Sequence, residues 1–504
     1  MRWYFGHMNS LNVSNRRLSK TIMQNLTSKT SLLTIVIFLG LALVYLWFRY
    51  SAGLAALLHQ RAVWEYRYDS LLHQFEKYSA EMKVKSSRLN WKSVREEKLL
   101  KAPIPWDEFK SSHPLPTVDK KDMHDKWLVV TTISEPTEDV KKLAKIEGWR
   151  LLVVGDKKTP EGWKVDNAIY LGIKEQEELG YNFANLMPYG NYARKSIGHL
   201  YAIHHGAKFI YETDDDNHPS DGKLHFHEKF KDSYLVYSTN RSVVNAYEFL
   251  GQSTIWPRGY PLDMIAEPPE YHAMKCEGAQ PLVQQGVVDG DPDIDAIYRL
   301  TRKDKGVRLD VKFDREQDVI LLPKGSFCPY NAQNTLYVYD SFWSLQFPST
   351  VNMRITDIWR SYFMQRLFWE IGGHLSFFPP SAYQYRSAHN YLKDFKDEKL
   401  LYYDSGRMVD FLLKWKPRFE DLFDNILDLS IQFAHMGFWG PADIHLTEAW
   451  LQDLVRIGYK RPKKNPLQGP CRKIVEKSLV EKKPKEQPSS YLRAGKKLVN
   501  VIAV

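Results

Sequence analysis

The segment that decides the fold is YARKSIGHLYAIHHGAKFIYETDDDN, which spans residues 192–217. Its first part carries apolar side chains at helical spacing and ends at Gly206, the kind of residue that commonly follows a helix. Residues 208–213 then form an apolar run typical of a strand, and an acidic triplet, Asp214–Asp216, follows directly. Because adjacent carboxylates repel one another, the triplet either lies in solvent as a turn or holds a cation.

Two further apolar runs and a helical pattern precede this segment. KWLVVTTI (126–133) and RLLVVGD (150–156) are short and rich in β-branched residues, and SEPTEDVKKLAKIEGW (134–149) between them has helix-start signals. The alternation of strand and helix predicts an α/β fold with a mostly parallel sheet flanked by helices. Ligands of such sheets bind beyond the carboxyl ends of the strands.

Polar motifs stand at three of these predicted strand ends: Thr131 with Thr132, Asp156 after a glycine, and the acidic triplet. A hard divalent cation such as Mn²⁺ or Mg²⁺ takes one or two carboxylates and completes its shell with phosphate oxygens and water. A nucleoside-diphosphate sugar supplies those phosphates. We therefore predict a metal–nucleotide site at the triplet, with a solvated turn as the alternative.

Five side chains near these ends are further candidates for nucleotide-sugar binding, and the first two are Thr131 and Thr132. Asp156 is placed to accept a hydrogen bond from a base or ribose, or it is an ordinary turn aspartate. Arg194 and Lys195 lie near the start of the helix that leads to the triplet. They either meet the diphosphate or form a solvated helix face.

An apolar segment near the N-terminus predicts a membrane anchor. SLLTIVIFLGLALVYLWF (31–48) has no charge and is long enough to cross a thin bilayer. Five basic residues and no acidic residue precede it, which predicts a cytoplasmic N-terminus and a luminal remainder. Asn240, in the sequence NRS, is then the glycosylation sequon on the luminal side.

The distribution of charge argues against a nucleic-acid partner. The formal net charge is +10, but the segment 460–504 alone holds 13 Lys or Arg and 3 Glu, and the first thirty residues are also basic. The part between the two ends is mildly acidic, so no basic groove is indicated. The cysteines Cys276, Cys328 and Cys471 lack metal-ligand spacing; they allow one disulfide, whose pairing the sequence leaves open.

Apolar residues near helical spacing after the anchor predict a helical stem, through which a homodimer can form, and a proline-rich linker follows. The predicted parts are a cytoplasmic tail (1–30), the anchor (31–48), stem and linker (49–125), an α/β domain (126–400), a helical subdomain (401–459) and a basic, disordered tail (460–504).

Three segments resemble a known family. WLVVTTISEPTEDVKKLAKIEGWRLLVVGDKKTP, YARKSIGHLYAIHHGAKFIYETDDDN and RITDIWRSYFMQRLFWEIGGHLSFFPP look like the STELLO-type glycosyltransferase-like proteins, which are type II membrane proteins of the Golgi. The likeness covers roughly residues 126–395. It implies a GT-A-like nucleotide-sugar fold with a D-x-D metal site. Under that resemblance Asp214 lies nearest the ribose, Asp216 ligates the metal, and Asp215 does either.

Two later residues complete the expected site. Thr356 is the expected N-cap of a helix that carries Asp357 in its first turn, and this carboxylate is our candidate for the base that takes the acceptor's proton. The alternative is an acidic residue favoured by the helix dipole. His389 is a candidate metal ligand, or a structural histidine.

These observations together predict a metal-dependent, luminal, single-pass Golgi glycosyltransferase that acts on a glycan, lipid or protein acceptor. The rival hypothesis is a membrane-anchored scaffold that keeps the nucleotide-sugar fold and binds partner proteins. The sequence leaves the donor sugar, the acceptor and the stereochemical course open.

Overall fold

The computed structural model describes residues 99–112, 114–265, 271–302, 308–384, 390–467 and 473–476. The predicted cytoplasmic tail, the anchor at 31–48 and the stem up to residue 98 lie outside these residues, as does most of the predicted C-terminal tail. Among the residues that are described, no helix is both long and apolar enough to cross a membrane.

The strands are β1 (Lys126–Thr131), β2 (Arg150–Val154), β3 (Ala168–Leu171), β4 (Phe209–Thr213), β5 (Asn217–Pro219), β6 (Ser233–Thr239), β7 (Tyr271–Glu277), β8 (Gln280–Gly290), β9 (Ile320–Leu321), β10 (Asn334–Val338), β11 (Gly373–Gln384) and β12 (Lys473–Glu476).

The α-helices are α4 (Glu108–Ser112), α5 (Glu138–Leu143), α6 (Ile173–Glu178), α7 (Asn182–Leu186), α8 (Lys195–His204), α9 (Ala246–Phe249), α10 (Ala296–Thr301), α11 (Thr356–Phe368), α12 (Tyr391–Asp397), α13 (Lys399–Lys414), α14 (Leu422–His435) and α15 (Ala442–Ile457). Short 3₁₀ turns are η1 (Lys120–Asp122), η2 (Tyr192–Arg194), η3 (Leu262–Met264) and η4 (Tyr339–Leu345).

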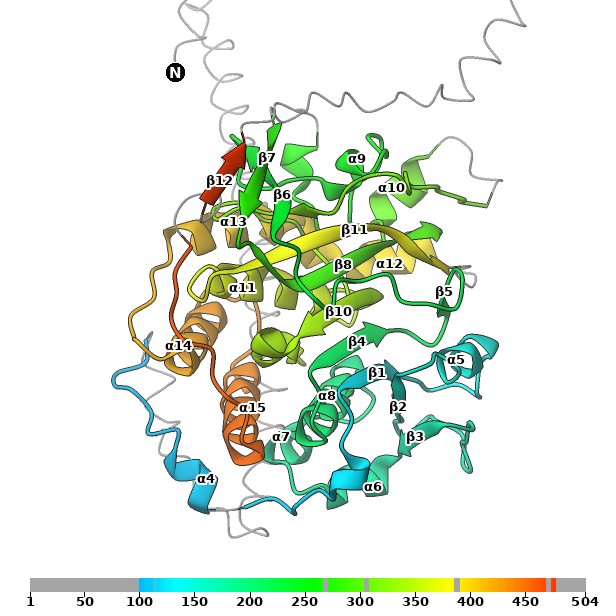
Figure 1. The fold of residues 1–504 in the computed structure, drawn as a ribbon, viewed down its shortest axis with the longest axis vertical. Helices are drawn as coiled ribbons and strands as arrows, with labels where there is room; N and C mark the ends of the chain where they lie inside the picture. The colour runs from blue at the N-terminus through cyan, green and yellow to red at the C-terminus, as the bar shows by residue number, and fades with distance from the viewer. Residues whose placement is uncertain are drawn as a thin grey trace, which may run out of the picture. The chain divides into compact units, whose positions relative to one another are not determined.

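All the described strands belong to one sheet with the order β12-β7-β6-β9-β11-β8-β10-β4-β1-β2-β3, and β5 pairs with β11 (Figure 1). Strands β4, β1, β2 and β3 pair in parallel, as do β8 with β11 and β6 with β9. Strand β10 enters antiparallel between β4 and β8. The predicted α/β class, with parallel pairing and flanking helices, is confirmed.

Helix α8 packs unusually close to the sheet and fixes where its first turn lies. A Cβ atom at Gly198 would come within 2.6 Å of Val154 and 2.9 Å of Val129, so only glycine allows this approach to β1 and β2. Ile197 and Leu200 are fully buried on the same side, as the apolar spacing predicted. Gly206, with a φ of +85°, ends the helix and turns the chain into β4.

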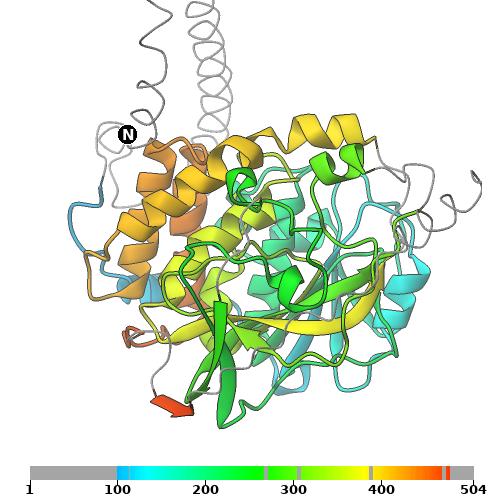
Figure 2. The same cartoon turned by 90° about the horizontal axis from the view of Figure 1, so that it is seen from above.

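The C-terminal helices pack beside the sheet, and Figure 2 shows them in yellow and orange together on one side. Helix α11 contacts β11 and α13, and α15 contacts α14, α7 and α8. Thr356 is not the N-cap of α11: the helix begins at Thr356, and its hydroxyl donates to the Asn352 carbonyl oxygen (3.2 Å) instead.

Part of the predicted linker is docked on this helical layer. Trp106 is 1% exposed, and its indole N–H donates to Asp424 Oδ1 at 2.9 Å. The backbone N–H of Leu100 donates to Asp428 Oδ1, also at 2.9 Å. Proline content gave no sign of this docking, because the segment is held by buried side chains such as Leu100 and Trp106 and by hydrogen bonds to two helix carboxylates.

Candidate active site

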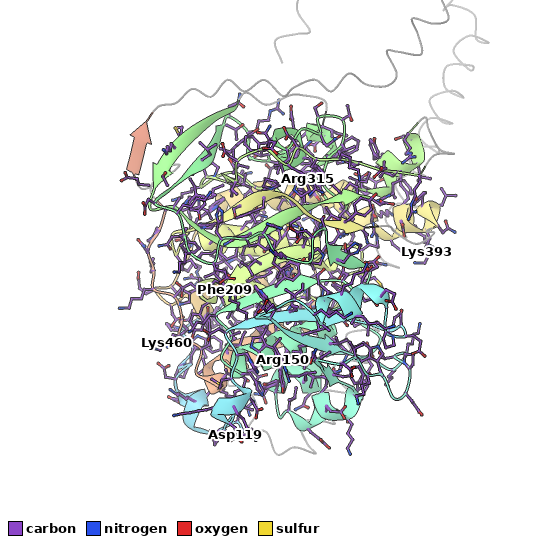
Figure 3. The ribbon with its side chains drawn as sticks, turned by 45° about the vertical axis from the view of Figure 1, so that its right-hand side comes forward. Asp119, Arg150, Phe209, Arg315, Lys393 and Lys460 are labelled. Carbon is purple, nitrogen blue, oxygen red and sulfur yellow. The ribbon has the colours of Figure 1, made fainter. Side chains whose placement is uncertain are left out.

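The acidic triplet follows β4, whose first residue, Phe209, is labelled in Figure 3. Its three carboxylates turn to different partners. Asp214 Oδ1 accepts from the Tyr192 hydroxyl (2.8 Å) and from the Lys195 ammonium (3.0 Å). Asp215 Oδ2 accepts from the Thr132 hydroxyl at 2.6 Å. The triplet is therefore not a free turn: it is tied to the ends of β1 and α8.

The third carboxylate reaches across the sheet toward β11. Asp216 Oδ1 accepts from Asn217 Nδ2 and Asp216 Oδ2 from Gln384 Nε2, both at 2.8 Å. Asn217 Oδ1 is buried and has no hydrogen-bond partner among the described residues. An unpaired oxygen thus belongs to the same amide that contacts the Asp216 carboxylate.

Burial shapes the electrostatics of the triplet. Lys195 is completely buried, and its ammonium group pairs with Asp214, whose side chain is 32% exposed. Burial, and next the charge of Asp214, raises the pKa of Tyr192 well above its usual value, which keeps the hydroxyl a donor. Burial also raises the pKa of Asp215, although the hydrogen bond from Thr132 opposes this effect.

Asp156 lies at the same edge of the sheet as the triplet. Its carboxylate accepts from the backbone N–H groups of Lys157 (2.7 Å) and Asn191 (3.1 Å). The Thr159 hydroxyl accepts from the Asp156 N–H and donates to the Thr132 carbonyl oxygen, both at 2.8 Å. Asp156 is therefore connected to the triplet through Thr132, and on its other side through Asn191, the neighbour of Tyr192.

Two predicted residues point elsewhere. Arg194 is 1% exposed; its Nε donates to Gln176 Oε1 and its Nη1 to the Met187 carbonyl oxygen, both at 2.9 Å. Gln176 in turn donates to the Gly155 carbonyl oxygen. Arg194 therefore supports, through Gln176, the residue that precedes Asp156. Thr131 donates to the Val154 carbonyl oxygen between β1 and β2. The solvated helix face considered for Arg194 and Lys195 is wrong, because both side chains are buried.

Asp357, the predicted base, is held in an ion pair. Arg258 Nη2 lies 2.8 Å from Asp357 Oδ2, Arg258 Nη1 lies 3.1 Å from Oδ1, and the same guanidinium also binds Asp293 at 2.8 Å. Both oxygens of this carboxylate are engaged by the guanidinium, so neither faces an acceptor hydroxyl. This geometry disfavours Asp357 as the base unless it separates from Arg258.

A buried ion pair that the sequence did not suggest lies under the triplet. Glu212 in β4 and Arg360 in α11 are both completely buried, with Nη2–Oε2 and Nη1–Oε1 distances of 2.7 and 3.1 Å. Burial would raise the pKa of Glu212, but Arg360, His199 and Lys195 together outweigh it and hold the pKa below its usual range. The pair links α11 to the strand that carries the triplet.

Sequence reasoning missed several residues that organise the site. Tyr192 is one of them, because its hydroxyl contacts Asp214. Its place three residues before Lys195, on one helical face, is the signal that identifies it. Gln384, Glu212 and Arg258 gave no recognisable signal, because each acts through a partner that is distant in the sequence.

Two predicted residues remain, Asn240 and His389. Asn240 is exposed just after β6, where its side-chain amide is accessible to modification. His389 falls outside the described residues, so its role as a metal ligand stays a prediction. Within the described part of the chain, no three histidine, cysteine, aspartate or glutamate side chains converge as a metal cluster would.

Comparison with known proteins identifies the family. The family model described as STELLO glycosyltransferases matches residues 354–468. The Arabidopsis thaliana protein named Probable glycosyltransferase STELLO2 is 39% identical over 383 residues, covering 73% of this chain and 50% of the relative. Probable glycosyltransferase STELLO1 from the same plant is 38% identical, covering 73% and 49%.

This chain belongs to the STELLO family. The resemblance read from the three sequence segments is confirmed. The chain spans about half the length of the curated STELLO relatives that it matches. The family model covers α11, with Asp357 and Arg360, and the C-terminal helices, whereas the acidic triplet lies outside the segment that it matches.

Proposed function

We propose that this STELLO-family chain transfers a sugar from a nucleoside-diphosphate sugar to an acceptor hydroxyl. The names of its relatives, which describe probable glycosyltransferases, support this reaction class. The observation that carries the proposal is the hydrogen-bonded network of Thr132, Asp156 and the triplet at the carboxyl ends of β1, β2 and β4. Such an edge is where open α/β sheets bind ligands.

The oxygen atoms at the triplet fit a divalent cation whose remaining coordination positions are filled by the phosphates of the substrate. Asp216 offers a carboxylate beside the unpaired Asn217 Oδ1, and Asp214 offers a second carboxylate. Mg²⁺ and Mn²⁺ are held by one or two carboxylates plus phosphate oxygens, so three converging protein ligands are not required. When bound, the cation supplies Lewis-acid stabilisation of the leaving diphosphate.

The chain's own residues then have separate tasks. Lys195, fixed by Asp214 and Tyr192, places a buried positive charge beside the bound diphosphate. Asp156 orients the ribose or the base by accepting a hydrogen bond. Asp357 remains the candidate base for the acceptor only in a state in which Arg258 has turned away from it.

A luminal Golgi location, with the anchor at 31–48, belongs to the same proposal. Cys276 forms a disulfide, whereas Cys328 is a buried free thiol. Disulfides persist in oxidising compartments, and the exposed Asn240 sequon suits the same side of a membrane. The acceptor, whether glycan, lipid or protein, and dimerisation through the stem remain part of the proposal.

Nucleotide-dependent thermal stabilisation of the full-length chain tests the transferase proposal. UDP or GDP with Mn²⁺ should raise the melting temperature, since a ligand at 100 times its Kd stabilises the folded state by about 2.7 kcal/mol. Asp216→Asn should abolish the shift. Asp232→Asn, which changes an exposed aspartate, is the matched control and should keep it.

Activity is measured by slow hydrolysis of the nucleotide sugar in the absence of an acceptor. A chain that no nucleotide stabilises, with or without Mn²⁺, would refute the transferase proposal and leave the scaffold hypothesis. A shift that survives Asp216→Asn would instead refute the assignment of the metal to the triplet.

A further inference from the structure

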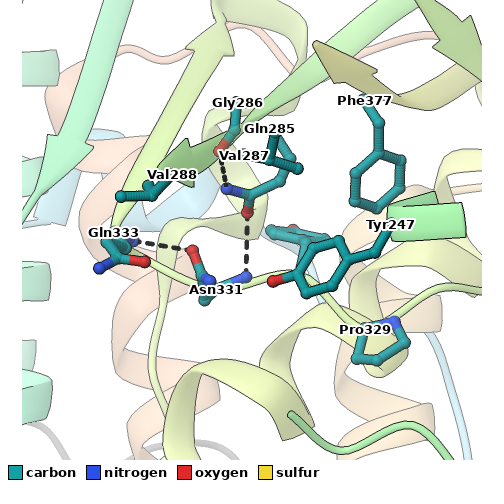
Figure 4. Close-up of a pocket in the computed structure, with 10 residues that line it drawn as sticks. Tyr247, Gln285, Gly286, Val287, Val288, Pro329, Asn331, Gln333 and Phe377 are labelled. Atoms are coloured by element: carbon teal, nitrogen blue, oxygen red, sulfur yellow. Dashed lines mark hydrogen bonds between the residues drawn. The ribbon is translucent and has the colours of Figure 1, made fainter. Parts of the chain in front are cut away.

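A small pocket lies between β8, β11, α9 and the loop that leads into β10 (Figure 4). One wall is apolar and includes Tyr247, Phe377 and Pro329, whereas the other carries the amides of Gln285 and Asn331, with Gln333 beside them. The cavity measures about 10 Å³. That is room for one group the size of a water molecule, not for a sugar ring.

The amides of this pocket differ in how fully they are satisfied. Gln285 Oε1 accepts from the Asn331 N–H (3.0 Å), and its Nε2 donates to the Gly286 carbonyl oxygen (2.8 Å). Asn331 Oδ1 accepts from the Gln333 N–H at 3.1 Å. Gln285 is thus a fixed part of the wall. It holds Asn331 in place, and Asn331 in turn holds Gln333.

Gln333 retains an unused acceptor. Its side chain is 5% exposed, and its Oε1 is buried with no hydrogen-bond partner among the described residues. Leaving a buried carbonyl oxygen unpaired costs free energy, so native proteins usually satisfy such atoms with water or ligand. Because Oε1 is an acceptor, its partner must be a donor small enough for the cavity, either a hydroxyl group or a water molecule.

Gln333 is also linked to the acidic triplet. Its Nε2 donates to Gln384 Oε1 at 2.5 Å, and Gln384 Nε2 donates to Asp216 Oδ2 at 2.8 Å. Two hydrogen bonds therefore separate the pocket amide from the carboxylate expected to hold the metal. A ligand whose diphosphate lies at Asp216 would carry its sugar next to this pocket.

We propose that this pocket receives one hydroxyl group of the donor sugar, which donates to Gln333 Oε1, and that it selects donors by that hydroxyl. The inference rests on the proposed function and deepens it by assigning a sugar-reading subsite. Tyr330 also lines the pocket, and its buried hydroxyl has no hydrogen-bond partner among the described residues, so it is a second polar group that the same occupant can meet. The small volume excludes a ring. The competing occupant is a permanently bound water.

Affinity measurements on the full-length chain with Mn²⁺ test the subsite. The probes are UDP against UDP-glucose and UDP-galactose, and GDP against GDP-mannose, by isothermal titration calorimetry. The measured quantity is the ratio of Kd for the bare diphosphate to Kd for its sugar conjugate. Gln333→Leu should lower this ratio for the preferred donor about 3- to 10-fold and leave the Kd of the bare diphosphate unchanged.

Two further variants keep the test decisive. Gln317→Leu removes an amide on a loop outside the pocket and should keep the wild-type ratio. Asn331→Ala removes the side chain that accepts from the Gln333 N–H, and it should lower the ratio as Gln333→Leu does. It therefore tests the subsite even if the Gln333→Leu variant fails to fold. The melting temperature without ligand reports folding of each variant.

Every contrary result overturns the subsite in a recognisable way. An unchanged ratio in a folded Gln333→Leu or Asn331→Ala variant means that the pocket holds only water. Equal weakening of diphosphate and conjugate means that Gln333 acts only through Gln384 on Asp216. Failure of the wild type to bind any diphosphate overturns the proposed function as well, whereas diphosphate binding without any gain from the sugar overturns the subsite alone.

Discussion

The buried pair between Glu212 and Arg360 gives the sharpest prediction about stability. Arg360→Met would leave the Glu212 carboxylate buried without its partner. The neighbouring His199 has its Nε2 3.3 Å from Glu212, but burial lowers the pKa of His199, so the ring is neutral at pH 7 while Arg360 is present. Removing one member of a fully buried pair costs about 3–5 kcal/mol.

Urea unfolding of the full-length chain, followed by tryptophan fluorescence, measures this cost. The double variant with Arg360→Met and Glu212→Leu should recover most of the lost free energy of unfolding, since no charge then remains buried. Lys208→Met is the control, because the Lys208–Asp125 pair is exposed and worth at most about 1 kcal/mol. A cost for Arg360→Met no larger than that of Lys208→Met would refute the reasoning.

Three further predictions concern other parts of the chain. Trp106→Ala should lower the free energy of unfolding by about 3–5 kcal/mol in urea, because it removes a buried indole, and a change below about 1 kcal/mol would contradict the docking of the linker. Burial lowers the pKa of His445 to about 4; its unfolded form binds more protons between pH 6.5 and 4, so stability falls as the pH drops through that range. His445→Gln should remove up to about 3 kcal/mol of that loss, and identical pH profiles would contradict it. Mass spectrometry without reductant should find Cys276 disulfide-bonded and Cys328 alkylated only after unfolding, whereas rapid alkylation of both would contradict the assignment.

The interpretation of Asp357 shows why sequence assigns such roles poorly. An aspartate in the first turn of a helix looks the same in sequence whether it is free or paired. The structure pairs it with Arg258, 99 positions away. No sequence feature near Asp357 indicates that it pairs with Arg258. Whether Asp357 is available as a base was therefore not predictable from the sequence.

The sequence by itself determined the local elements and the edge of the sheet at which the polar motifs gather. Apolar periodicity and glycine stops are local signals, and they located β1, β2, β4 and α8. Parallel pairing then forces the ends of β1, β2 and β4 to one edge, which places Thr132, Asp156 and the triplet together.

Only the tertiary structure decided which partner each carboxylate takes. Asp216 meets Gln384 across 168 positions, and Glu212 meets Arg360 across 148. These contacts depend on β11 and α11 packing beside β4, and packing of distant segments leaves no periodicity within either one. Local sequence can therefore place a charged side chain at an edge, but its protonation, its pairing and its access to a ligand follow from neighbours that folding alone brings near.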